Sequence, residues 1–125
     1  MFEIGNEYSI FEIKENLDVK EGNQMMKNGK LFVAICLEKG INYIEPNIML
    51  VKDGSLIRKI GRDLSGAKYP INIFIKEQKN SKYKYIGKFD ILETKTAPIK
   101  IKSILEKFPN INPKEISRLV YLNIV

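Results

Sequence analysis

The sequence predicts an α+β, mostly β fold: a small antiparallel β-barrel with a short N-terminal helix and C-terminal helices. Three observations lead to this fold class. Several runs of strand length, apolar or alternating in polarity, follow one another between turn signals. A helix-capping pattern precedes them, and helix signals return near the end of the chain. The length of 125 residues fits one domain. We expect the barrel over about residues 1–102 and a helical segment over about 103–125.

The first elements are a helix, a loop and a buried strand. A helix is expected over residues 10–17, because Ser9 and Glu12 have the spacing of a capping box and a short apolar stripe follows. Residues 18–30 are polar, contain two glycines and are expected to form a loop. The continuous apolar run 31–37 predicts a strand that is buried on both faces.

A hairpin is expected next. Residues 40–47 form a connection, and residues 48–51 form a second strand. Asp53 and Gly54 are typical of a tight turn, after which residues 55–60 return as the hairpin partner.

The remaining barrel strands follow a polar loop over residues 61–69. Residues 71–76 alternate in a way that predicts a strand with Ile71, Ile73 and Ile75 facing inward. After a turn at 79–82, residues 83–91 return as its partner, and a last strand over about 98–102 closes the barrel.

The C-terminal segment carries helix signals. Residues 103–108 are expected to be helical, and Pro109 ends that helix. Asn112 would cap a further helix, with Pro113 in its first turn and Glu115 completing the box. Its apolar side would be formed by Ile116, Leu119, Val120 and Leu122. The chain stops without a polar tail, so we expect it to be an N-terminal module of a longer protein.

Composition excludes several kinds of chemistry. The chain has no histidine and one cysteine, Cys36. A Ser-His-Asp or Cys-His centre, a structural zinc site and a disulfide framework therefore cannot be built from it. There is also no GxxxxGK[ST] phosphate loop. We expect no enzyme activity, no metal and no cofactor, and the free cysteine with no export signal indicates a cytoplasmic protein.

Charge is distributed unevenly along the chain, which has a net charge of +6. Residues 1–51 hold five basic and eight acidic side chains, a net charge of −3. Residues 52–102 hold thirteen basic and five acidic side chains, a net charge of +8. This asymmetry is typical of a protein that binds a polyanion, although a lysine-rich solvated surface would give the same counts.

Two stretches resemble a known family. The first stretch lies near the N-terminus and contains Phe2, Gly5, the pair Tyr8–Ser9 and Glu12. The second is an apolar strand ending in Lys76, followed by a hairpin that reads Tyr83-x-Tyr85-x-Gly87-Lys88, with Pro98–Ile101 as the closing strand. In this order and separation they are similar to the SRA-like, PUA-like domains of modification-dependent restriction systems.

This resemblance implies a reader module. Members of that family bind DNA that commonly contains 5-methylcytosine or another modified base, and several flip the base into a pocket of the barrel. A separate nuclease or motor domain, in the same or another chain, then acts on the DNA. We therefore expect duplex DNA with a modified base as the partner, and no membrane.

The residue types agree with such a reader. Lysines and arginines would neutralise phosphates, and aromatic rings would stack on an extruded base. The predicted phosphate-binding residues are Lys52, Arg58, Lys59, Arg62, Lys68, Lys82, Lys84 and Lys88. The predicted base pocket contains Tyr43, Asp63, Tyr69, Tyr83 and Tyr85, where Asp63 would accept a hydrogen bond from an exocyclic amine. For Tyr83 and Tyr85 a place in the barrel core is the competing interpretation.

Two other functions stay open at the level of sequence. An RNA-binding PUA-like domain would use the same tyrosines and basic groove. In a protein–protein docking domain, the terminal helices would matter most and the basic stretch would be incidental. A metal-dependent nuclease is disfavoured. Asp18-x-Lys20 and Glu77-x-Lys79 place a carboxylate and a lysine two residues apart, but both fall in polar loops without a preceding Pro-Asp pair.

Overall fold

The computed structural model describes residues 2–20, 22, 25–28, 31–52, 70–79 and 81–125. The chain divides into two compact units. The first comprises the described residues of Met1–Lys39, Tyr69–Asp90 and Ile124–Val125, and the second those of Gly40–Lys68 and Ile91–Asn123. The predicted turn, hairpin partner and loop over residues 53–69 lie outside the described residues. The predicted mostly β content is confirmed, since strands make up most of the regular structure that is described.

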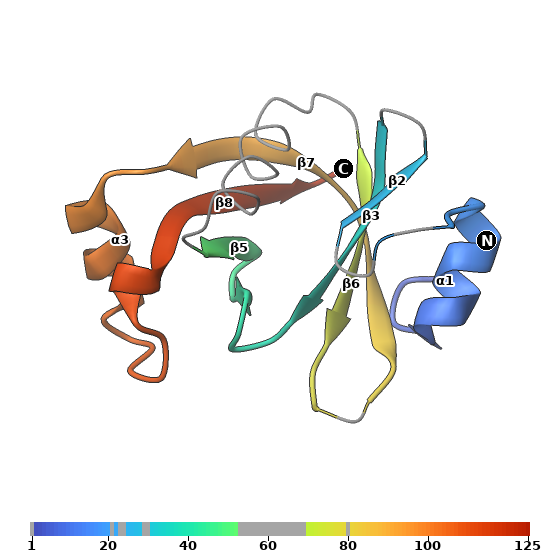
Figure 1. Ribbon diagram of the computed structural model, residues 1–125, viewed down its shortest axis with the longest axis horizontal. Helices are drawn as coiled ribbons and strands as arrows, with labels where there is room; N and C mark the ends of the chain where they lie inside the picture. Colours follow the sequence, from blue (N-terminus) through green and yellow to red (C-terminus); the bar gives the residue numbers. More distant parts are fainter. Residues whose placement is uncertain (1, 21, 23–24, 29–30, 53–69, 80) are drawn as a thin grey trace. The chain divides into compact units, whose positions relative to one another are not determined.

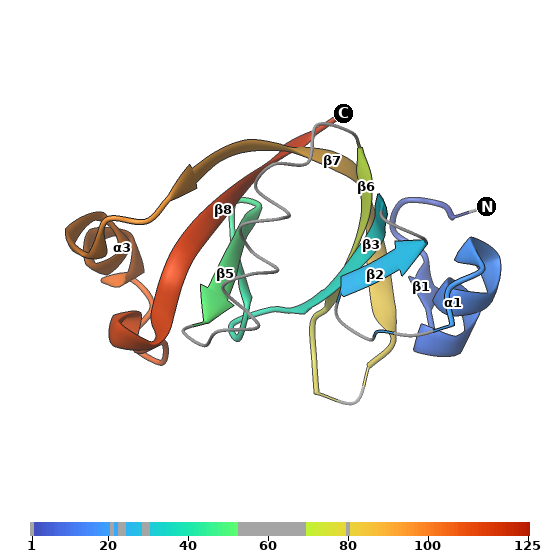
Figure 2. The same ribbon diagram turned by 45° about the horizontal axis from the view of Figure 1, so that its top comes forward.

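The first unit is built around a sheet with the strand order β2-β3-β6-β7, and β1 pairs with the start of β7. Strand β3 runs parallel to β6, whereas β1 with β7, β2 with β3 and β6 with β7 are antiparallel pairs. Figures 1 and 2 show α1 beside this sheet. The elements are β1 (Glu7–Tyr8), α1 (Ile10–Leu17), β2 (Met25–Asn28), β3 (Leu31–Glu38), β6 (Ile71–Lys76) and residues 83–90 of β7 (Tyr83–Lys95).

Helix α1 begins where its cap predicts. The side-chain oxygen of Ser9 accepts the N–H of Glu12 at 3.2 Å, and the Glu12 carboxylate accepts the N–H of Ser9 at 3.1 Å. The helix buries Ile13 completely against one face of the sheet. The core on that face consists of Ile13, Val19, Met26, Ala34, Cys36, Phe74 and Tyr85.

The opposite face of this sheet is also buried. The predicted inward set is confirmed, because Ile71 and Ile73 are 0% exposed and Ile75 is 4% exposed. On β3, Ile35 and Leu37 are buried as well as Cys36, which confirms a strand covered on both sides.

The second unit contains the remaining strands of the same sheet and a helix. From β7 the strand order continues as β8-β5-β4, and residues 91–95 of β7 belong to this unit. Helix α3 packs on this sheet through Ile101 and Leu105, which meet Leu50, Leu119 and neighbouring apolar residues. The elements are β4 (Tyr43–Ile44), β5 (Ile48–Lys52), α3 (Pro98–Leu105), the 3₁₀ turn η1 (Pro113–Glu115) and β8 (Ile116–Ile124).

The predicted closing strand over residues 98–102 is wrong, because these residues begin helix α3. Pro98 stands in the first turn, where its missing N–H is not required. Ile101 and Leu105 are one helical turn apart and each 2% exposed, whereas Ile99 is 78% exposed. The alternation of isoleucine and lysine therefore reflects a helix that buries one side only.

The predicted helix after Asn112 is also wrong. Asn112 caps as expected, accepting the N–H of Lys114 at 3.0 Å, but the helix is one 3₁₀ turn long. Residues 116–124 then form β8, which pairs with β5. The helical segment over 103–125 is thus replaced by the end of α3, a turn and a strand.

Two short strands lie in stretches that were predicted to be loops. Strand β2 falls within residues 18–30, and β4 falls within residues 40–47. The predicted strands over 31–37, 48–51, 71–76 and 83–91 are confirmed by β3, β5, β6 and the first part of β7. In the described residues the strand order ends on β2 and β4 and is open, so the predicted closed barrel is not confirmed. No helix in the described part of the chain is long and apolar enough to cross a membrane.

Candidate nucleic-acid interface

Four of the predicted phosphate-binding residues are described. Lys52 is exposed at the end of β5 in the second unit. Lys82, Lys84 and Lys88 belong to the first unit, on β7 or directly before it. The other four, Arg58, Lys59, Arg62 and Lys68, lie outside the described residues.

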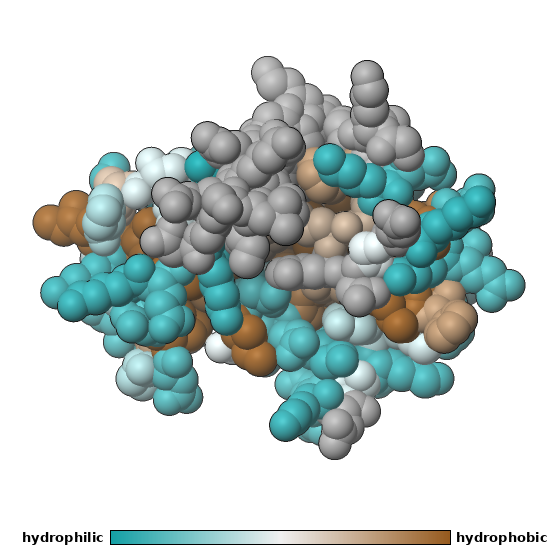
Figure 3. Space-filling model, viewed as in Figure 1, coloured by the Kyte–Doolittle hydropathy of each residue, from teal (hydrophilic) through white to brown (hydrophobic). Residues whose placement is uncertain are grey.

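The structure brings Lys82 and Lys84 together at a cleft of about 260 Å³ beside the turn between β6 and β7. Ile75 contributes apolar surface, and six polar residues complete the lining: Glu7, Glu77, Gln78, Ser81, Lys82 and Lys84. Figure 3 shows hydrophilic side chains covering this end of the β6–β7 hairpin. The cleft therefore presents charged groups of both signs.

Both cleft lysines contact carboxylates. Lys84 forms an ion pair with Glu77. The Lys82 ammonium nitrogen lies 3.9 Å from a carboxylate oxygen of Glu12. The hydrogen bond from Lys84 lowers the pKa of Glu77, and the same contact raises the pKa of Lys84. Both partners are consequently charged at neutral pH.

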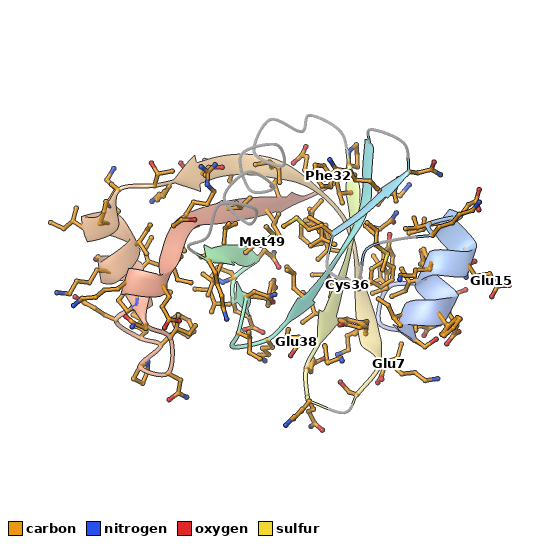
Figure 4. All side chains as sticks on the ribbon, viewed as in Figure 1. Glu7, Glu15, Phe32, Cys36, Glu38 and Met49 are labelled. Carbon is orange, nitrogen blue, oxygen red and sulfur yellow. The ribbon has the colours of Figure 1, made fainter. Side chains whose placement is uncertain are left out.

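Glu7 contributes a third carboxylate to the lining of the cleft. It is the antiparallel partner of Lys84 in the register between β1 and β7. Figure 4 labels Glu7 beside the lower part of β7. Cross-strand partners of opposite charge attract each other, so Lys84 is placed between two acidic neighbours.

Lys88 is different from the other two lysines of the hairpin. It is exposed, lies opposite Asn72 in the register between β6 and β7, and is not among the residues that line the cleft. Its carbonyl oxygen accepts the N–H of Val125 at 3.0 Å. At Lys88 the backbone of β7 is thus paired on both sides, while the Lys88 side chain is exposed.

Tyr85 occupies a core position. It is 6% exposed, and its ring lies 5.0 Å from that of Phe74 and 5.5 Å from that of Phe2, measured between centroids. Its hydroxyl donates to the side-chain oxygen of Asn72 at 2.8 Å, and the Asn72 amide donates to the Val33 carbonyl at 2.9 Å. Burial raises the pKa of Tyr85, so the hydroxyl keeps its proton at neutral pH. This packing favours the core interpretation of Tyr85 over the base-pocket one.

The other two described tyrosines differ in exposure. Tyr43, in the second unit, is 6% exposed, and its hydroxyl donates to the side-chain oxygen of Asn47 at 2.7 Å. Tyr83, in the first unit, is half-buried, and the Lys76 ammonium group lies 4.8 Å from its ring centroid. Of the described tyrosines of the predicted pocket, Tyr83 thus has the most accessible ring. The remaining predicted pocket residues, Asp63 and Tyr69, lie outside the described residues.

The sequence did not indicate that Glu7 and Glu12 would lie beside the hairpin lysines. They precede Lys82 by about seventy residues, and no spacing rule connects positions so far apart. Glu12 was recognisable as a helix cap only. Glu77 is closer in sequence to Lys84. Its position directly after β6 is the local signal that could have indicated an ion pair with Lys84 across the hairpin.

No group of three or more histidine, cysteine, aspartate and glutamate side chains is placed to hold a metal ion among the described residues. Cys36 is a free thiol, 3% exposed, and burial raises its pKa to about 12. Figure 4 labels it on β3. A buried thiol of this kind is a core side chain rather than a nucleophile.

This chain is similar to known proteins in structure, and comparison of sequences finds no match. No protein-family model matches the sequence, and no curated protein matches it. Among solved structures, the SUVH5 SRA domain in complex with hemimethylated CG DNA is similar, with a TM-score of 0.61, 11% identity, and coverage of 99% of this chain and 89% of that chain. The SUVH5 SRA complexes with fully methylated CG DNA and with methylated CHH DNA each give a TM-score of 0.57 and 15% identity, covering 98% of this chain and 88% of theirs.

At this level of identity the likeness defines the fold. The chain has an SRA-like fold, and the fold that the sequence resemblance implied is confirmed. The match extends over nearly the whole chain, including the segment after residue 102 where the secondary-structure prediction failed.

Proposed function

We propose that this protein is a DNA-binding reader domain that recognises a modified cytosine in duplex DNA. The observation that supports the proposal most is the SRA-like fold over 98–99% of the chain, with neighbours that are SRA domains in complex with methylated DNA. The excess of basic residues over residues 52–102 agrees with a polyanionic partner.

The finer proposal is that the modified base leaves the duplex and enters a pocket of a closed barrel. An extruded base needs an aromatic or apolar surface on which to stack. Tyr43 and Tyr85 are buried and hydrogen-bonded, so we assign each of them to packing within its own unit rather than to stacking on a base. Tyr83 is our described candidate for a base contact, and Tyr69 and Asp63 remain candidates from the sequence.

Phosphate contacts are proposed for the basic residues named above, of which Lys52, Lys82 and Lys88 are exposed. Such contacts position the protein on DNA without reading the sequence. We further propose that the domain itself is not catalytic and directs a separate nuclease or motor domain in the cytoplasm.

The test is an equilibrium titration of the full chain with matched duplexes. The duplexes are identical except for one base and contain cytosine, 5-methylcytosine or N6-methyladenine at that position. We expect affinity to fall steeply with salt, and at least a tenfold preference for the 5-methylcytosine duplex, about 1.4 kcal/mol. Equal affinities for all duplexes, or tighter binding to a hairpin RNA, would contradict the proposal.

A charge-reversal variant tests the phosphate contacts separately. Lys88→Glu should weaken binding to every duplex by the same factor and reduce the salt slope by about 1. The matched control is Lys107→Glu, an exposed lysine after α3 that is outside the predicted set. If both variants weaken binding equally, Lys88 makes no specific phosphate contact and only net charge matters.

A further inference from the structure

Two lysines of the β6–β7 hairpin, Lys82 and Lys84, have acidic neighbours, although the sequence makes this segment strongly basic. Two ammonium groups, those of Lys82 and Lys84, face three carboxylates, those of Glu7, Glu12 and Glu77. Lys39 also acts on Glu77 through its charge. The acidic N-terminal part of the chain therefore supplies two of the carboxylates that offset the basic hairpin.

These carboxylates come from three places in the fold: β1, α1 and the residue directly after β6. Glu7 belongs to β1 and is in register with Lys84 on β7. Glu12 is fixed by the capping box, because its carboxylate accepts the Ser9 N–H at 3.1 Å. Glu77 follows the last residue of β6 directly. Their approach to the two lysines is thus a consequence of how the first unit folds.

Stability gives little reason for this arrangement. The paired side chains retain 41–61% of their exposure, and exposed ion pairs contribute little to folding. The carboxylates make the electrostatic potential at the hairpin less positive, and this potential acts on an approaching polyanion. A phosphate that approaches Lys84 meets the Glu77 carboxylate on the same ammonium group and is repelled by its charge.

We propose that Glu7, Glu12 and Glu77 are specificity-determining residues that suppress sequence-independent attraction of DNA phosphates to the β6–β7 hairpin. The inference rests on the proposed function, because it concerns how a DNA reader limits binding to unmodified duplex. A lysine that is already neutralised releases few counterions when it meets a phosphate, so it adds little to non-specific affinity. Discrimination between modified and unmodified DNA then depends more on the contacts made to the base.

The test replaces two carboxylates by neutral side chains of nearly equal shape. The variant Glu7→Gln with Glu77→Gln removes both acidic neighbours of Lys84 and leaves Glu12 beside Lys82. We expect tighter binding to the unmodified duplex and a salt slope steeper by about 0.9, since one lysine becomes available. The loss of affinity between about 50 and 200 mM salt should then be roughly three- to fourfold larger than in the original protein. The preference for the modified duplex should fall.

The matched control is Glu106→Gln with Glu115→Gln, which removes the same charge from two exposed residues of the second unit. An equal change in slope for both double variants would overturn the inference, because net charge alone would explain it. An unchanged slope in the hairpin variant would also overturn it. Unchanged melting temperatures establish that the variants are folded. If the hairpin double variant does not fold, the salt slope of the single variant Glu77→Gln is compared with that of the original protein instead.

A failure of the inference can be distinguished from a failure of the proposed function. The proposed function is judged from the original protein, by its preference among duplexes. The inference is judged from the difference between variant and original protein on unmodified DNA. If the original protein binds no duplex, binding gained by the hairpin variant supports the inference, and absence of binding by both overturns it.

Discussion

Replacing Tyr85 by phenylalanine separates a core role from a base-contact role. The change removes the hydroxyl that donates to Asn72 at 2.8 Å and keeps the ring between Phe2 and Phe74. A hydrogen bond of this kind contributes about 1 kcal/mol to stability. Asn72 is half-buried and keeps its own bond to the Val33 carbonyl, so water takes over part of the lost contact. We expect a loss of about 1–2 kcal/mol in the free energy of unfolding.

Urea denaturation measures this loss, with the midpoint and slope fitted together so that a change in compactness is recognised. The matched control is Tyr83→Phe, because no hydrogen bond of the Tyr83 hydroxyl is found within the described residues. That control should change stability by less than about 0.5 kcal/mol. Binding of Tyr85→Phe to modified and unmodified duplexes should keep the ratio of the original protein. Unchanged stability together with a lost preference would refute the assignment of Tyr85 to the core.

Three further predictions concern local features of the first unit. Ser9→Ala removes the cap of α1 and should lower the free energy of unfolding by about 1 kcal/mol in urea denaturation, whereas Ser9→Asp should retain most of it. Gly87 has a φ of +117°, and an added side-chain carbon would lie 3.4 Å from Ile4. Gly87→Ala should therefore lower the free energy of unfolding by more than about 1 kcal/mol and lower the melting temperature. An unchanged melting temperature would contradict the positive φ at Gly87. Cys36, whose pKa burial raises to about 12, should react with iodoacetamide at about pH 8 only after unfolding, as followed by mass spectrometry.

The elements that the sequence predicted correctly carry strong local signals. The capping pattern of Ser9 and Glu12 determines the start of α1 without help from distant residues. The apolar runs of β3 and β6 are of strand length and rich in β-branched residues, so few other structures could bury them. Local chemistry was sufficient for these elements.

The failures occurred where distant pairing decides the structure. In β8, Leu119 and Val120 are adjacent and both fully buried, so both faces of the strand are covered at this point. Such a strand loses its alternation, and its apolar residues at spacings of three and four imitate a helix. In α3, Pro98 was the decisive local signal, but the alternation that follows it concealed the helix.

The candidate site shows the same division. The sequence indicated that Lys82 and Lys84 belong to a basic hairpin, and the structure places both at one cleft. It did not indicate the carboxylates of Glu7 and Glu12, because these approach only when β1 and α1 pack beside the hairpin. Charge along a chain therefore overestimates charge in space wherever an acidic segment folds onto a basic one.

We propose above that this chain distinguishes a modified cytosine in duplex DNA from an unmodified one. A competition assay tests this property: a labelled 5-methylcytosine duplex is displaced by an unlabelled duplex of the same sequence, methylated or not, at about 0.15 M salt. We expect that at least about ten times more unmodified competitor is needed for half displacement. Equal displacement by the two competitors would contradict it.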